Sequence, residues 1–183
     1  DGHKDLIVTN GLYRDMRNND FNIMRRKFME DKLEEAKAMG IKTLVVDPLE
    51  LIEKAPSTPI RNFIFQNNGD LTFTQRNTTW GLADKGFSHG TVYVDLDNDG
   101  DLDVVMNNLN EEAGIYKNRT SDNQYHQFLR VKPVDGTNKL GVIGAQVSIY
   151  YGNGAQQMQE LAPTRGYMST CENILHFGLG TIG

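Results

Sequence analysis

A run of alternating aspartates between two apolar stretches constrains this chain more than any other feature. The run is Asp95-Leu96-Asp97-Asn98-Asp99-Gly100-Asp101-Leu102-Asp103, so five carboxylates fall within nine residues, around one glycine. Residues 91–94 precede the run and residues 104–106 follow it, and both stretches are typical of β-strands. Carboxylates this close repel one another unless a cation lies among them. The sequence therefore predicts a metal-binding loop between two strands.

The spacing of the aspartates favours Ca²⁺, which takes about six to eight oxygen ligands. Counting from Asp95, side-chain oxygens of Asp95, Asp97, Asp99 and Asp103 fall at alternate or nearly alternate positions, and Asp101 offers its backbone carbonyl. Gly100 permits the sharp turn that points successive ligands inward. We predict that Asp95, Asp97, Asp99, Asp101 and Asp103 bind Ca²⁺, the one cofactor that the sequence indicates.

Three other interpretations of the acidic run compete with calcium binding. An EF-hand requires an acidic residue where this chain has Met106, and it requires helices rather than strands on both sides. An Asp-x-Asp phosphatase motif also follows a strand, but it has Thr or Val at the position of Asp99, and the βα units of such enzymes are missing. A solvated acidic turn without an ion stays open, although five clustered carboxylates without a cation are costly.

Composition and charge exclude several classes of function. The chain has 183 residues, of which 38% are hydrophobic, enough for a core without disulfides, and Cys171, the single cysteine, is expected to be a small buried residue. A net charge of −5 argues against nucleic acid or an anionic membrane as the partner. No apolar stretch is long enough to span a membrane. Because no methionine or signal peptide precedes Asp1, we expect a piece of a longer protein.

The N-terminal third combines one strand with two helices. Leu6–Val8 reads as a strand. A helix of about 20 residues should follow, with Asp20 as its N-cap and Gly40 after its end. Its apolar stripe should pack in a core, although it could instead bind a partner; the stripe is Phe21, Met24, Phe28, Met29, Leu33 and Ala36. A capping box at Asp47-Pro48-Leu49-Glu50 predicts a second helix that ends near Ala55.

From residue 60 the sequence indicates mainly β structure. An Asn68-Gly69 turn joins two predicted strands into a hairpin, and three further strands are predicted over residues 128–131, 145–151 and 157–161. A polar stretch at 120–124 reads as a linker. We therefore expect a mainly β fold in two domains, residues 1–119 with a helical insertion at about 14–56, and residues 125–183 as a small β-sandwich-like domain.

A short internal repeat relates the start of the chain to the acidic run. Residues 1–10 align with residues 99–108: both have Asp-Gly, a second Asp, three apolar residues and an Asn. Asp1 and Asp5 are therefore predicted ligands of a truncated second loop. Repeats that each supply a few strands suggest a partial β-propeller.

No catalytic residues are predicted. The four histidines are scattered: we expect His3 and His126 at the surface, and His89 and His176 in structural roles. No Ser/His/Asp or Cys/His set is apparent. Trp80 and Tyr167 could stack on sugars, although core packing is the favoured role. Asn77 and Asn118 begin glycosylation sequons. The alternative to a non-catalytic module is a carbohydrate-active or other hydrolase domain with a site on the propeller face.

Several of these motifs resemble known families. The acidic run resembles the calcium loop of FG-GAP/VCBS repeats, the blades of integrin-α-like β-propellers, and residues 65–73 (FQNNGDLTF) resemble the strand pair of the same repeats. Three segments are similar to the ASPIC/UnbV domain found after such repeats: residues 141–147 (GVIGAQV), 165–170 (RGYMST) and 175–180 (LHFGLG). The family pattern continues beyond Gly180, so we expect this last domain to be incomplete.

The resemblance implies a non-catalytic, calcium-binding module of an exported protein. It implies adhesion or ligand binding outside the cell, at the cell surface or in the periplasm, with an unknown protein or glycan as the partner. A purely structural interaction module, with the helical insertion docking a partner, is a further reading.

Overall fold

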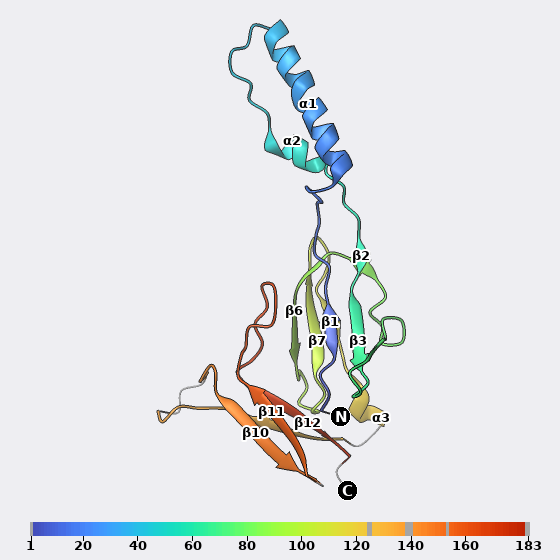
Figure 1. Cartoon of the computed structure of the whole chain (residues 1–183), viewed down its shortest axis with the longest axis vertical. Coiled ribbons are helices and arrows are strands. Elements are labelled where there is room, and N and C mark those ends of the chain that lie inside the picture. Colours follow the sequence, from blue (N-terminus) through green and yellow to red (C-terminus); the bar gives the residue numbers. More distant parts are fainter. Residues whose placement is uncertain (1, 124–125, 138–140, 153, 182–183) are drawn as a thin grey trace. The chain divides into compact units, whose positions relative to one another are not determined.

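The computed structural model describes residues 2–123, 126–137, 141–152 and 154–181. The fold is mainly β, as the sequence predicted, and it carries a helical insertion (Figure 1). Residue contacts divide the chain into two units. Unit 1 comprises Asp1–Gly11 and Arg61–Gly183, and unit 2 comprises Leu12–Ile60.

Two small antiparallel sheets form the first part of unit 1. One has the strand order β1-β3-β4 and the other the order β6-β7-β8. The strands of the first sheet are β1 (Leu6–Val8), β3 (Phe63–Asn67) and β4 (Phe73–Gln75), and those of the second are β6 (Ser88–Val94), β7 (Asp103–Asn108) and β8 (Gly114–Tyr116). The Asn-Gly hairpin predicted between β3 and β4 is confirmed, with Gly69 at φ 79° and Asn68 N donating to Thr72 O at 3.0 Å.

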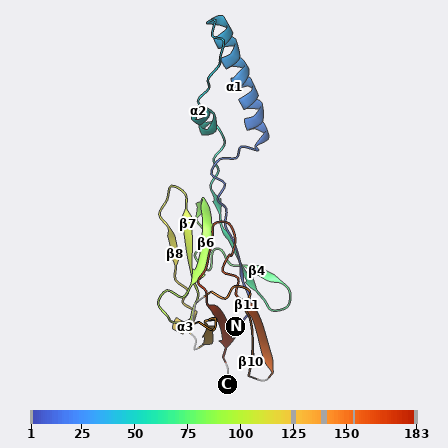
Figure 2. The ribbon, with the colours of Figure 1, turned by 90° about the vertical axis from the view of Figure 1, so that its left-hand side faces the viewer.

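Two antiparallel pairs form the C-terminal part of unit 1 (Figure 2). They are β9 (Gln127–Val131) with β12 (Leu175–Gly180), and β10 (Gln146–Tyr151) with β11 (Ala155–Glu160). Three short elements complete the unit or lie at its boundary: β2 (Ile60–Arg61), β5 (Lys85–Gly86) and helix α3 (Thr120–Asn123). The predicted linker at 120–124 was therefore wrong in part, because its first four residues form the helical turn α3.

Each part of unit 1 has its own small apolar core. Ile64, Leu82 and Met106 are buried together in the first part. Leu161, Leu175 and Phe177 are buried together in the second, where the side chains of Leu175 and Phe177 alternate along β12. This alternation buries every second side chain of a strand, as the pleat requires. The β6–β7 pair belongs to the first core and carries the acidic run between its strands.

Unit 2 contains two helices joined by a loop. The first is α1 (Asn19–Ala38), and its N-cap is Asn18, whose Oδ1 accepts from Phe21 N at 3.0 Å. The predicted N-cap, Asp20, was wrong by two residues, because the Asn18 side chain already caps the helix and Asp20 lies in the first turn. The second helix, α2 (Pro48–Glu53), has the predicted N-cap, since Asp47 Oδ1 accepts from Leu49 N at 2.9 Å.

The apolar stripe of α1 is only partly buried. Phe21 and Ala36 are buried, whereas Met29 and Leu33 are 38% and 45% exposed. The ammonium group of Lys54, just after α2, lies 5.4 Å from the centre of the Phe28 ring. The expected core packing was therefore wrong for Met29 and Leu33, because the short helix α2 covers only one end of α1 (Figure 1).

Candidate metal centre

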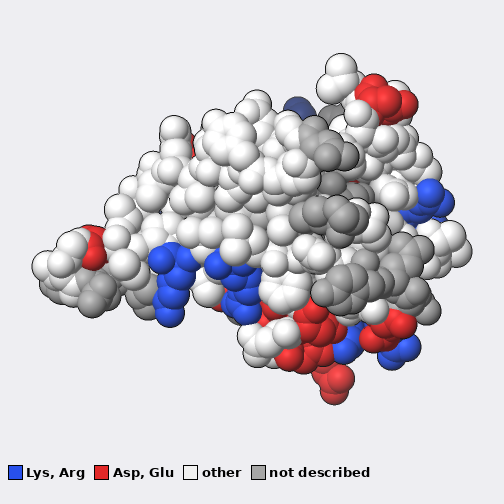
Figure 3. All heavy atoms as spheres, turned by 90° about the horizontal axis from the view of Figure 1, so that it is seen from below, with Lys and Arg blue, Asp and Glu red and all other residues white. Residues whose placement is uncertain are grey.

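The acidic run forms the connection between β6 and β7. Val94 pairs with Asp103 across the two strands, so the register of the hairpin fixes where the loop begins and ends. Asp95, Asp97 and Asp99 each place one carboxylate oxygen within 4.8 Å of the others. Figure 3 views the molecule from the end at which β6 leads into β7, and acidic side chains gather there with basic ones beside them.

The backbone of the loop turns through two left-handed residues. Asn98 has φ 63° and Gly100 has φ 91°. Asp99 Oδ1 accepts from Asp101 N at 2.9 Å, and Asp95 Oδ2 accepts from Gly100 N at 3.3 Å. A Cβ added at Gly100 would overlap the Phe128 ring. The predicted sharp turn at Gly100 is confirmed, and both its φ and its close neighbour favour glycine.

The carboxylates of Asp101 and Asp103 anchor the loop to the chain after β8. Asp103 is 2% exposed, and its two oxygens accept from Asn118 N at 2.8 Å and from Leu96 N at 3.1 Å. Asp101 Oδ2 accepts from Ser121 N, in α3, at 2.6 Å. Sequence reasoning missed these contacts, since nothing in the motif indicates which distant amides its carboxylates will accept from.

Asp95, the first aspartate of the loop, is also buried. Its side chain is 0% exposed, and Oδ2 also accepts from Arg130 Nη1 at 3.4 Å. The other oxygen, Oδ1, is buried and has no hydrogen-bond partner among the described residues. A buried carboxylate oxygen without a positive or donating neighbour is costly. A cation bound among Asp95, Asp97 and Asp99 would satisfy this oxygen, so the donor set fits a hard metal ion.

Lys117 supplies a positive charge on the outer side of the loop. Its ammonium group pairs with Asp97 Oδ2 and lies 3.3 Å from Asp99 Oδ2. The hydrogen bond from Lys117 holds the pKa of Asp97 below its usual range, and the same contact raises the pKa of Lys117. The outer carboxylates of the loop therefore already attract a cationic group. Lys117 could not be predicted as a neighbour of the loop, because it belongs to no recognisable motif.

The truncated second loop is described only in part. Asp1 lies outside the described residues. Asp5 Oδ1 accepts from Asn67 N at 2.8 Å, and Asn67 Nδ2 donates to Lys4 O at 3.2 Å. Asp5 thus links the residues before β1 to the end of β3.

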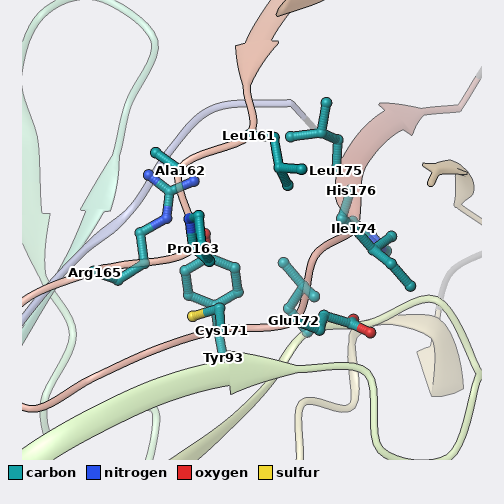
Figure 4. A pocket seen from close by; sticks show the side chains of 11 residues that line it. Tyr93, Leu161, Ala162, Pro163, Arg165, Cys171, Glu172, Ile174, Leu175 and His176 are labelled. Carbon is teal, nitrogen blue, oxygen red and sulfur yellow. The ribbon is translucent and has the colours of Figure 1, made fainter. Parts of the chain in front are cut away.

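A shallow pocket lies between β6 and the segment that precedes β12. Figure 4 shows side chains of Tyr93, Arg165, Cys171, Glu172 and His176 among its lining residues. The Arg165 guanidinium lies 6.0 Å from the centre of the Tyr93 ring, and burial raises the pKa of Tyr93. Glu172 supplies the one carboxylate of the described lining, and it bonds to Arg130. The described lining therefore holds one carboxylate and not a facing pair, which is the arrangement typical of glycosidases.

Other residues singled out from the sequence have structural surroundings. Asn77 is 3% exposed, and its side-chain amide bonds to Asn62 O and Leu82 O, so the folded chain buries this sequon. Trp80 and Tyr167 are 40% and 65% exposed, so the expected core packing was wrong for both; Tyr167 lies in the irregular 165–169 segment beyond the Thr164–Thr170 bridge. Cys171 is half-buried rather than fully buried.

Comparison with known proteins confirms both resemblances. The FG-GAP-like repeat family matches residues 56–106, which include β3, β4, β6 and most of the acidic loop hairpin. The ASPIC and UnbV family matches residues 135–183, which include β10, β11 and β12. The chain is thus similar to an FG-GAP-like repeat over residues 56–106 and to the ASPIC and UnbV family over residues 135–183.

The curated relatives carry the same name in two species. Cartilage acidic protein 1 of Homo sapiens and that of Mus musculus are each 26% identical to this chain over 122 residues. The match covers 64% of this chain but only 18% of each relative. No solved structure matches the chain significantly. None of the described helices is long and apolar enough to cross a membrane.

Proposed function

We propose that this chain is a non-catalytic module of an exported protein and that the β6–β7 loop binds Ca²⁺. Asp95, Asp97 and Asp99 would supply the first carboxylate ligands. Asp101 would add its backbone carbonyl, and Asp103 would add a carboxylate oxygen, since each oxygen that accepts one hydrogen bond keeps a further lone pair. Asp1 and Asp5 would belong to a second such loop.

The unsatisfied Asp95 Oδ1 is the observation that carries this proposal. A solvated acidic turn would expose its carboxylates to water, whereas the Asp95 side chain is 0% exposed and lies beside two further carboxylates. Burial of charge without compensation is strongly unfavourable. A divalent cation would place two positive charges among the three carboxylates, in addition to Lys117 and Arg130, and would hold β6 and β7 in register.

The setting of the module supports a role in binding outside the cell. The matched families and the name of the relatives favour an extracellular protein whose repeats bind a protein or glycan partner. The reducing cytosol offers little free calcium, so a loop of this kind is most useful in a secreted protein or one at the cell surface. The bound ion would act as a structural element of that surface.

Calorimetric titration with calcium chloride, compared with magnesium chloride, tests the proposal. We expect calcium to bind and to raise the unfolding midpoint. The free energy of unfolding should increase by about 2.7 kcal/mol when free calcium is a hundredfold above the dissociation constant. Asp95→Asn should abolish most of this gain, and Asp84→Asn, at an exposed acid of unit 1 outside the loop, should keep it. Equal unfolding midpoints with and without calcium, together with no heat of binding, would contradict the proposal.

A further inference from the structure

The C-terminal pair β9–β12 packs directly on the acidic loop. The Phe128 ring lies against Gly100, close enough that a Cβ there would overlap it. The His176 ring stacks on Phe128, with 5.5 Å between ring centres and 5° between planes. Phe128 and Arg130 are two residues apart on β9 and therefore lie on the same face of the strand. This face is the one that the loop covers.

Arg130 connects the loop to the segment that precedes β12. Its Nη1 donates to Asn98 Oδ1 at 2.9 Å and approaches Asp95 Oδ2 at 3.4 Å. Its Nη2 donates to both oxygens of Glu172, at 3.2 and 3.3 Å. The Arg130 side chain is 25% exposed, so solvent screens these contacts less than it would at the open surface.

We propose that cation binding by the loop and docking of the β9–β12 pair favour each other through Asp95, with Arg130 as the positioning residue. This inference rests on the proposed calcium function of the loop. Arg130 holds Oδ2 of Asp95 and so fixes the carboxylate that also carries the unsatisfied Oδ1. An ion at the loop would tie Asp95 to Asp97 and Asp99.

The backbone of the loop explains why the coupling is positive. Phe128 contacts the loop at Gly100, and Arg130 contacts it at Asn98 as well as at Asp95. Asn98 and Gly100 adopt left-handed φ angles, and the same turn gathers Asp95, Asp97 and Asp99. A ligand that stabilises this turn stabilises the surface on which β9–β12 docks. By linkage, docking must then raise the affinity for the ligand by the same factor.

The charge of Arg130 acts in the opposite direction and must be separated from its positioning role. An isolated guanidinium beside Asp95 would repel a divalent cation. Glu172 neutralises Arg130 through its bidentate contact. The double variant Arg130→Gln/Glu172→Gln therefore removes the contact without changing the net charge, and any change in affinity then reports positioning.

Amide hydrogen exchange of the full chain gives the first test and needs no variant. Calcium chloride should slow exchange in the loop and also in residues 127–131 and 175–180. In the double variant, the dissociation constant for calcium measured by calorimetry should rise at least about five-fold. Calcium should also no longer slow amide exchange in β9 and β12.

Ser169→Ala is the matched control, because Ser169 contacts β6 outside the acidic loop. Ser169 Oγ accepts from Thr91 N at 2.9 Å, away from the loop carboxylates. This variant should loosen residues 164–170 and leave calcium affinity unchanged.

The outcomes separate this inference from the proposed function. No calcium binding by the unaltered chain would overturn both. Calcium binding with unchanged or faster exchange in β9 and β12, or with unaltered affinity in the double variant, would overturn the coupling alone.

Discussion

At the scale of single residues, the two oxygens of Asp95 have different surroundings. Oδ2 accepts from Gly100 N and approaches Arg130 Nη1, whereas Oδ1 is buried with no hydrogen-bond partner in the described part of the chain. Asp97 and Asp99 are more exposed and share the Lys117 ammonium. The loop therefore has an inner carboxylate held by hydrogen bonds from Gly100 and Arg130, and outer carboxylates that pair with the Lys117 ammonium.

Lys117→Met should tighten calcium binding by up to about five-fold, the upper end of the range expected for loss of one solvent-exposed ion-pair partner. Lys117 contacts two of the proposed ligands, so an incoming ion must compete with a charge that is tethered beside it. Calorimetric titration measures the change, with Lys85→Met on the exposed part of β5 as the control. Weaker binding in the Lys117 variant would mean that the lysine supports the site rather than competing for it.

Gly100→Ala should destabilise unit 1 more than Gly81→Ala does. Both glycines have positive φ, which costs an alanine about 1–2 kcal/mol. Gly81 has open space at its Cβ position, whereas Gly100 faces the Phe128 ring, and such overpacking adds about 1–3 kcal/mol. Urea unfolding of the two variants gives the difference. Equal losses would show that Phe128 can move away without cost.

At the scale of elements, the sequence predicted hairpins better than it predicted isolated strands. Strong β-formers and turn residues identified β1, the β3–β4 hairpin and the strands around the acidic loop. The prediction missed β8, which is only three residues long, and β12, whose two glycines have low strand propensity. β12 is a strand because Leu175 and Phe177 are buried in the second core. That is a tertiary effect, invisible in a local pattern.

In the candidate site, too, the features set by local sequence could be predicted, and the contacts made by residues distant in sequence could not. The spacing of the aspartates indicated the loop and the turn at Gly100. Neither Arg130 nor Glu172 could be assigned to the loop, because their contacts depend on how β9 and the segment before β12 pack on it.

The N-terminus of α1 provides a test at this scale. Asn18→Ala should lower the stability of α1 by about 1 kcal/mol, because the Asn18 side chain caps Phe21 N. Asp20→Ala, at the position that the sequence favoured, should cost less, since Asp20 lies in the first turn and stabilises the helix through its dipole. Amide exchange within residues 21–25 measures both. A larger loss of helix stability in the Asp20 variant than in the Asn18 variant would show that Asp20 is the N-cap of α1.

At the scale of the whole molecule, unit 2 is an insertion between two paired strands. β1 and β3 are antiparallel neighbours, and the chain leaves after β1 and returns just before β3. Asn10 closes the gap, because its Nδ2 donates to Arg61 O at 2.7 Å and its N donates to Asn62 Oδ1 at 3.0 Å. The hairpin of unit 1 is therefore held at its open end by contacts that lie within unit 1 itself.

Replacing residues 12–60 with a short Gly/Ser linker should leave unit 1 folded and able to respond to calcium. A short connection suffices because Asn10 already binds Arg61 and Asn62, and a shorter loop lowers the entropy cost of closing the hairpin. The apolar clusters of unit 1 draw on no residue of the insertion. Thermal unfolding with and without calcium, followed by circular dichroism in the β region, measures the result.

A shortened chain that aggregates or unfolds without a cooperative transition would show that the insertion is needed to fold the strands. If it folds but no longer binds a partner of the intact chain, the exposed Met29 and Leu33 on α1 become the first residues to substitute in search of the binding surface.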